Sequence, residues 1–263
     1  MSKWFIRPCK VDIGNMCRKM GINVPLALAL QSKGLNTPKK VKDYFNTENY
    51  NFGDITQLIG VKRSFEIIEK AINKRKKIFI YGDYDVDGVT STVILYKSLK
   101  AIGADVFYYI PNRVKDGYGL NVNAIERLIE KGMELLITCD NGIAAIEEIK
   151  YAKEKGIDVV IYDHHEPVIK DGKEVLPEAD SVTDAKIENC GYDFTVMCAG
   201  GLCYRVMKAF YEYLGEKYTL EEEMVIFAGI ATVCDVVDLI GENRAIAKRS
   251  LELINANIEN TGL

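Results

Sequence analysis

The sequence predicts an α/β protein in which helices cover both faces of a parallel sheet. Short runs that are apolar throughout recur between residues 77 and 162, and such runs are typical of strands buried on both faces. Helical stretches of about 10 to 15 residues separate them, as in β-α-β units. At 263 residues the chain has room for one large domain with a small appendage.

We expect residues 1–60 to form a small helical appendage and residues 61–263 to form the main domain. In the appendage, Thr37 followed by Pro38 has the pattern of a helix N-cap and first helical position. Ser64 is predicted to cap a further helix that leads into the main domain.

Predicted strands and helices alternate in the main domain. The strands are Ile78–Tyr81, Val106–Ile110, Leu135–Thr138 and Val159–Tyr162. The helices between them are Val89–Ile102, Asn123–Lys131 and Ile143–Lys155, each followed directly by a glycine. Beyond Pro167 we expect an irregular stretch to about Phe194, and then helices at Gly201–Leu214 and Leu220–Val233.

Composition excludes several classes of protein. The net charge of -4 argues against bulk basic binding of nucleic acid, so any such contact must be local. No apolar stretch reaches the roughly 20 residues that a membrane span needs, and no secretory signal is evident, which favours a soluble, cytoplasmic protein. The seven cysteines form no C-x-x-C pair and are predicted to be reduced core thiols.

Acidic and imidazole side chains follow three of the predicted strands. Asp83, Asp85 and Asp87 follow the first strand, Asp140 follows the third, and the segment Asp163–His165 follows the fourth. The chain has only two histidines, and they are adjacent in that segment. Because ligands bind at the carboxyl ends of parallel strands, we expect these side chains to meet.

This set of side chains indicates a metal site. If the segment that carries Asp85 and Asp87 is extended, both side chains point the same way, and the crowded charges then need a cation. Oxygen and nitrogen ligands favour Mn²⁺, or otherwise Mg²⁺, and two such ions catalyse phosphoester hydrolysis. The alternative is a solvated acidic turn beside hydrogen-bonded loop histidines.

Two further residues are candidates for phosphate binding. Gly88 opens the helix after the acidic turn, where free backbone N–H groups could face a phosphate. Arg113 follows the second strand and is a bidentate phosphate donor.

The motifs resemble those of the DHH phosphoesterase family. The matching segments are D-Y-D-V-D-G at 83–88, C-D-N-G-I at 139–143 and D-H-H at 163–165. Three further segments resemble the RecJ-like branch of that family. They are I-P-N-R at 110–113, G-Y-G-L-N at 117–121 and C-D-V-V-D-L-I-G-E-N-R at 234–244. The resemblance implies a metal-dependent exonuclease that degrades single-stranded DNA from the 5′ end in repair or recombination, with a repair or replication protein as a possible partner.

The resemblance also implies roles for individual residues. Its metal ligands fall on Asp85, Asp87, Asp140, His164 and Asp235. Asp140 would lie between two ions, and His165 would face the scissile phosphate or support a ligand. Arg113 and Asn141 would contact substrate, Asp83 and Asp163 would orient the ligands, and Asp238 and Glu242 are read as surface or capping residues.

The sequence departs from the family pattern in three places. Tyr81 stands where the phosphatase branches carry a histidine, and Thr183–Lys186 lacks the expected Asn-Pro. The sequence also stops before the DHH-associated second domain that such nucleases carry, so we expect a catalytic domain without it.

Two other functions fit the same residues. One is a related phosphodiesterase that acts on short oligonucleotides or cyclic dinucleotides. The other is a non-catalytic DHH interaction module in a repair or replication assembly.

Overall fold

The computed structural model describes residues 12–47, 50–114, 117 and 119–256, in two compact units that divide between Tyr50 and Asn51. Cys9, Tyr118 and the segment 260–263 lie outside the described residues. The predicted boundary stood near residue 60. Segment 51–60 belongs to the second unit because Ile55 and Leu58 are buried in its main core.

The first unit contains three short helices. They are α1 (Ile13–Met20), α2 (Val24–Ser32) and α3 (Pro38–Phe45). The predicted cap of α3 is confirmed, because the Thr37 side chain accepts a hydrogen bond from the N–H of Lys40 and Pro38 follows it. A small core of Met16, Ala27, Leu30 and Val41 holds the three helices together.

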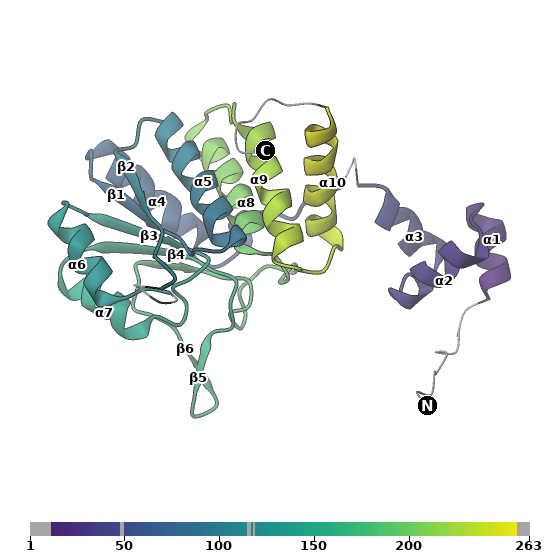
Figure 1. The fold of residues 1–263 in the computed structure, drawn as a ribbon, viewed down its shortest axis with the longest axis horizontal. Helices are drawn as coiled ribbons and strands as arrows, with labels where there is room; N and C mark the ends of the chain where they lie inside the picture. The colour runs from purple at the N-terminus through teal and green to yellow at the C-terminus, as the bar shows by residue number, and fades with distance from the viewer. Residues whose placement is uncertain (1–11, 48–49, 115–116, 118, 257–263) are drawn as a thin grey trace. The chain divides into compact units, whose positions relative to one another are not determined.

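The second unit is built on a five-stranded parallel sheet in the order β2-β1-β3-β4-β7 (Figure 1). Its strands are β1 (Ile78–Tyr81), β2 (Val106–Tyr109), β3 (Leu135–Cys139), β4 (Asp158–Tyr162) and β7 (Ser181–Thr183). The four predicted strands are confirmed within one residue at each end. The fold class, a parallel sheet flanked by helices, is confirmed.

The strand register brings the ends of the strands to one edge. Tyr81 pairs with Tyr109 on one side and with Thr138 on the other. Tyr162 pairs with Cys139 in β3 and with Thr183 in β7. The residues that follow β1, β3, β4 and β7 therefore emerge side by side.

Helices cover both faces of the sheet, as predicted. Figure 1 shows α6 and α7 on one side and α4, α5, α8 and α9 on the other. Alternate residues of β1 divide between the two cores: Phe79 and Tyr81 belong to the core under α6 and α7, whereas Ile78 and Ile80 belong to the larger one. This alternation explains why the strands are apolar throughout.

The helices of this unit are α4 (Val61–Asn73), α5 (Val86–Ala101), α6 (Val122–Glu130), α7 (Ile146–Glu154), α8 (Ala199–Leu214), α9 (Glu221–Cys234) and α10 (Gly241–Asn255), with a short 3₁₀ helix η1 (Ile55–Gln57) before α4. Five of them, α5 to α9, begin and end within three residues of the predicted positions, whereas α10 and η1 were not predicted. The predicted cap at Ser64 is wrong. Ser64 lies within α4, where its buried hydroxyl donates to the carbonyl of Val61 and accepts from Tyr162.

The stretch predicted to be irregular contains three short strands. β5 (Val168–Lys170) and β6 (Lys173–Val175) form an antiparallel hairpin, and β7 joins the main sheet. Three-residue strands are too short to show periodicity in a sequence.

Glu242 is not a surface residue, contrary to the prediction. It is 2% exposed. Its carboxylate accepts a hydrogen bond from the Tyr192 hydroxyl at 2.5 Å and lies 3.2 Å from Nε of Arg205. Arg205 also donates to the carbonyl of Gly53. A buried carboxylate is stable only when paired in this way, so this network joins segment 51–60, α8 and α10.

None of the helices in the described part of the chain is long and apolar enough to cross a membrane.

Two glycines with nearly equal φ angles allow a test of the contact between α4 and β7. Gly60 (φ +85°) precedes α4, and a Cβ there would lie 2.2 Å from the carbonyl oxygen of Val182; Gly103 (φ +83°) has nothing within 4 Å of such a Cβ. Gly103→Ala should lower the free energy of unfolding by about 1–2 kcal/mol, because an L-residue is disfavoured at positive φ. Gly60→Ala should lower it by about 1–3 kcal/mol more, because the added methyl overpacks the contact.

Urea unfolding of the two variants measures both costs. Equal losses would show that β7 does not pack closely on the start of α4.

Candidate metal centre

The acidic turn after β1 leads directly into α5, so only its first part, up to Asp85, lies outside the helix. Asp85 is the N-cap of α5, and its carboxylate accepts a hydrogen bond from the N–H of Gly88 at 2.9 Å. Asp87 already lies in the first turn of the helix and is buried. The assumption of an extended segment through Asp85 and Asp87 is therefore wrong, because α5 begins at Val86, three residues earlier than predicted.

The N-terminus of α8 holds Asp87. The N–H of Ala199 donates to Oδ2 of Asp87 at 2.8 Å, and the N–H of Gly200 donates to Oδ1 at 2.7 Å. The first N–H groups of a helix lack partners within the helix and carry partial positive charge, so they suit a carboxylate. A Cβ on Gly200 would lie 2.5 Å from Cβ of Ala231, so only glycine allows α8 this close to α9. The A-G-G sequence was the available signal for this contact, and our sequence reading missed it.

Asp140 lies between the acidic turn and the histidines. Its backbone has φ +62°, an unusual value for a residue with a side chain. Its Oδ1 lies 3.0 Å from Nε2 of His164. Burial raises the pKa of Asp140 to about 10, and the charges of Asp87 and Asp85 add to the shift.

Asp163 orients the segment that follows β4. One of its oxygens accepts from Nδ1 of His165 at 2.7 Å and from the N–H of His164 at 2.8 Å, and the other accepts from the N–H of Ile143 at 2.9 Å. Burial acts to raise the pKa of Asp163, but the hydrogen bonds, led by that from His165, leave it below its ordinary value. The same bond raises the pKa of His165.

Both ring nitrogens of His164 face carboxylates. Besides its contact with Asp140, Nε2 lies 3.5 Å from Asp87, and Nδ1 lies 3.8 Å from Asp235. Asp235 caps the C-terminus of α9, far from the other residues in sequence. It was expected only from the family resemblance.

The predicted residues form three overlapping groups whose ligand atoms lie within 4.8 Å of one another. The groups are Asp83, Asp85 and Asp140; Asp140, His164 and His165; and Asp87, His164 and Asp235. Asp140 and His164 each belong to two groups. Oδ1 of Asp83 is also buried without a hydrogen-bond partner in the described part of the chain. These oxygens and nitrogens fit divalent cations, which would offset the crowded negative charge.

Other predicted residues lie around the groups. Arg113 is exposed, and its guanidinium stacks over the ring of Tyr84 at 5.4 Å. Asn141 is buried beside Asp140. The N–H of Gly88 is not the free donor that we predicted, because it bonds to Asp85. Tyr81 is buried on the α6 side of the sheet, and its hydroxyl donates to the carbonyl of Gly119 at 3.1 Å.

Asp184 is an acidic strand end that the sequence reading missed. It follows β7 and is fully buried. One oxygen accepts from the N–H of Lys186 at 2.8 Å, while Oδ2 has no hydrogen-bond partner among the described residues. Burial raises the pKa of Asp184 to about 7. The sequence reading could identify Asp184 as a strand end only if it predicted β7, which it did not.

Comparison with known families gives one match over most of the second unit. The model of the DHH family, N-terminal domain, matches residues 77–232.

Curated relatives extend the similarity. The chain is 38% identical to the single-stranded-DNA-specific exonuclease RecJ of Bacillus subtilis over 251 residues, which is 95% of this chain and 30% of that protein. It is 35% identical to the Haemophilus influenzae exonuclease of the same name over 76% of this chain and 35% of the relative. The chain thus spans about a third of the length of these relatives.

Solved structures agree in fold. A crystal structure of exonuclease RecJ bound to manganese is 32% identical, with a TM-score of 0.68 over 76% of this chain and 49% of that one. The structure of RecJ with Mn²⁺ from Thermus thermophilus is 26% identical, with a TM-score of 0.73 over 93% of this chain and 33% of that one.

Asp235 and Asp238 provide a matched test of the metal site. Asp235→Asn should weaken Mn²⁺ binding by roughly tenfold or more, because it removes a charged ligand from the group with Asp87 and His164. Asp238 is exposed, three residues away and in none of the groups, so Asp238→Asn should bind Mn²⁺ like the unaltered protein. Isothermal titration calorimetry measures both, and equal affinities would remove Asp235 from the site.

The raised pKa of Asp140 predicts how pH affects the metal-free protein. The carboxyl keeps its proton in the folded state up to about pH 10, whereas its ordinary pKa is 3.8. Its contribution to stability is therefore fully present below pH 3.8 and is lost as the pH rises towards 10. Mn²⁺ bound by Asp140 would displace this proton, so the apparent affinity for Mn²⁺ should rise roughly tenfold per pH unit between about pH 6 and 8.

Chemical unfolding across this pH range, with and without Mn²⁺, tests the prediction. Asp140→Asn has no proton to lose and should flatten the pH dependence of the metal-free protein. An unchanged slope in that variant would assign the effect to another group.

Proposed function

The chain belongs to the DHH family, and from this we propose that it is the metal-binding catalytic part of an exonuclease that hydrolyses phosphodiester bonds in single-stranded DNA. The observation that carries the proposal is the row of three overlapping carboxylate and histidine groups. The similarity to RecJ exonucleases supports the substrate class. Digestion from the 5′ end, a role in DNA repair or recombination, a protein partner and a cytoplasmic location are parts of the same proposal.

The proposed ions are two divalent cations, Mn²⁺ or Mg²⁺. Their ligands would be Asp85, Asp87, Asp140, His164 and Asp235, with Asp140 shared between the ions. When bound, such ions activate water and neutralise charge on a phosphoryl group. Asp83 stands within reach of the first group and would orient or supplement its ligands.

The remaining residues would act on the substrate directly. Asp163 favours the protonated form of His165, so this ring would present positive charge to the scissile phosphate. Arg113 would offer a permanently charged donor, and its stacking on Tyr84 limits the conformations of the guanidinium. Asn141 is the other proposed substrate-binding residue, whereas Gly88 is left out because its N–H already donates to Asp85.

We propose that residues 61–263 form the catalytic domain and that segment 51–60, which shares its core, belongs to it, whereas the residues before Asn51 form the helical appendage. The DHH family model matches residues 77–232, which lie within this domain.

Hydrolysis of a 5′-labelled single-stranded oligonucleotide tests the function. With Mn²⁺ the chain should release mononucleotides, and Asp140→Ala should lower the rate by about two orders of magnitude or more, because the shared ligand supplies several kcal/mol of charge stabilisation. Asp171→Asn, an exposed change in the β5–β6 turn, is the control and should retain full activity.

Three outcomes would contradict the proposal. Full activity of Asp140→Ala would reject the metal site as the catalytic centre. Cleavage of a dinucleotide or cyclic dinucleotide but not of a long strand would favour the short-oligonucleotide phosphodiesterase. Failure to bind Mn²⁺ would favour the non-catalytic module.

A further inference from the structure

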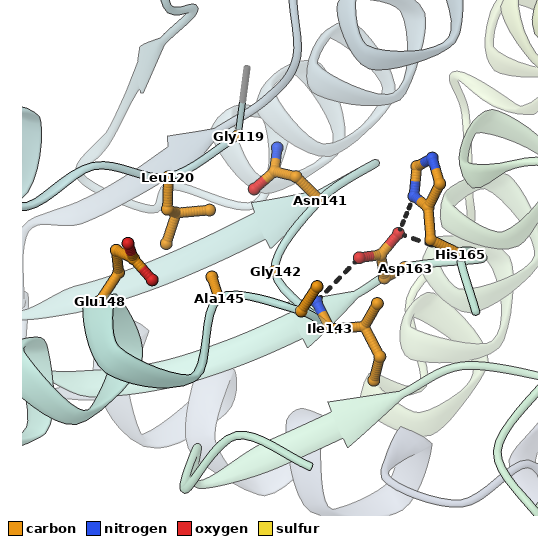
Figure 2. Close-up of a pocket in the computed structure, with 10 residues that line it drawn as sticks. Gly119, Leu120, Asn141, Gly142, Ile143, Ala145, Glu148, Asp163 and His165 are labelled. Atoms are coloured by element: carbon orange, nitrogen blue, oxygen red, sulfur yellow. Dashed lines mark hydrogen bonds and ion pairs between the residues drawn. The ribbon is translucent and has the colours of Figure 1, made fainter. Parts of the chain in front are cut away.

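A cavity of about 330 Å³ opens beside the metal centre, on the α6 and α7 side of the sheet edge. Figure 2 shows His165 and Asp163 at one end of it and Leu120 and Glu148 at the other. Ligand sites of about 300–1,000 Å³ are usual, so this one is at the small end of the range. It can hold a group of the size of one nucleoside.

The walls of the cavity are mostly apolar. Leu120, Ile143 and Ala145 line it, and the loop that carries Ile143 is fixed by the hydrogen bond from its N–H to Asp163. Gly142 forms part of the lining with φ +116°, and a Cβ there would lie 2.5 Å from Oγ1 of Thr138. The cavity is therefore shaped by a rigid turn, and its apolar walls suit the faces of a sugar and a base.

The side-chain amide of Asn141 gives the cavity a hydrogen-bond acceptor. Its Nδ2 donates to the carbonyl of Cys139 at 3.0 Å and to that of Tyr81 at 3.4 Å. These two acceptors fix the orientation of the amide, because Oδ1 could not replace Nδ2 there. Oδ1 has no partner among the described residues, and Figure 2 shows it on the side that faces Leu120.

Glu148 gives the far end of the cavity a second acceptor. It lies in the first turn of α7 and is partly buried. A carboxylate in this position repels a phosphate but accepts hydrogen bonds from N–H or O–H groups. The cavity therefore disfavours a phosphate at the Glu148 end and favours a neutral group with donors.

We propose that this cavity binds the sugar and base of a single nucleotide whose phosphate lies at the carboxylate and histidine groups. The proposal rests on the proposed function, since that function puts the phosphate there. Glu148 and Asn141 then act as acceptors for donors of the base or sugar, and Leu120, Ile143 and Ala145 pack against the rings. Glu148 and Ala145 are specificity-determining residues in this view.

Binding of deoxyguanosine 5′-monophosphate tests the cavity without requiring catalysis. Guanine offers N–H donors that suit a carboxylate. In the presence of Mg²⁺, calorimetry should show that this nucleotide binds at least about tenfold more tightly than inorganic phosphate, because only the nucleotide fills the cavity. The methyl resonances of Leu120 and Ile143 should shift on addition of the nucleotide and not on addition of phosphate.

Two variants and a matched control locate the effect. Glu148→Ala should weaken nucleotide binding by about tenfold, the usual scale for a hydrogen bond to a charged group, and Ala145→Phe should do the same by filling the cavity. Neither should change the affinity for inorganic phosphate. Glu147→Ala is the control, because Glu147 carries the same charge in the same helical turn but is exposed and does not line the cavity.

The proposal is overturned if the nucleotide binds no more tightly than phosphate, or if Glu148→Ala and Ala145→Phe both bind it like the unaltered protein. Thermal unfolding of each variant shows whether a loss of binding reflects a loss of folding. Cavity-dependent binding in a chain that hydrolyses no oligonucleotide would retain the cavity and reject the nuclease function. Hydrolysis without cavity-dependent binding would reject the cavity as a nucleotide site and retain the nuclease function.

Discussion

The repulsion among carboxylates at one edge of the sheet is the constraint on which the rest of the site depends. The parallel register makes these carboxylates neighbours, because β1, β3 and β4 end side by side. The protein supplies hydrogen-bond donors for two of them. The first N–H groups of α8 donate to Asp87, and the N–H groups of Ile143 and His164 donate to Asp163. The carboxylate of Asp140 has His164 as its hydrogen-bond partner among the described residues, and burial, with the charges of Asp87 and Asp85, raises its pKa to about 10. A divalent cation is the simplest group that resolves this imbalance.

The backbone at this edge adopts conformations that few residues allow. Asp140 has a left-handed backbone, and a Cβ on Gly142 would collide with Thr138. A Cβ on Gly88 would lie 2.6 Å from the backbone of Asp83, and a Cβ on Gly200 would lie 2.5 Å from Cβ of Ala231, so neither position has room for a side chain. Such strain persists only where the surrounding structure fixes it, and here the same loops place the carboxylates and shape the cavity.

Much of the fold was predictable from sequence, because strands buried on both faces show as apolar runs and helices end at glycines. Three strands of three residues each were not predicted, and because β7 was one of them, Asp184 was not recognised as the residue that follows a strand. The geometry of Asp85 and Asp87 was misread because a helix start depends on capping contacts that periodicity does not show. Glu242 was misread for a different reason: its partner Arg205 lies 37 residues away in sequence, and only the folded chain brings them together.

The same edge explains how a chain with net charge -4 could handle a polyanion. Without ions the edge repels phosphate, because its carboxylates outnumber its cationic groups, whereas in the proposed function the bound ions reverse the local charge. The ions that relieve the repulsion among the carboxylates would then also attract the phosphate, at the same edge of the sheet. The adjoining cavity keeps its own negative charge at Glu148, at the end away from His165. This polarity would orient a nucleotide with its phosphate towards the ions and its base towards α7, so that charge at the edge sets the direction in which substrate enters.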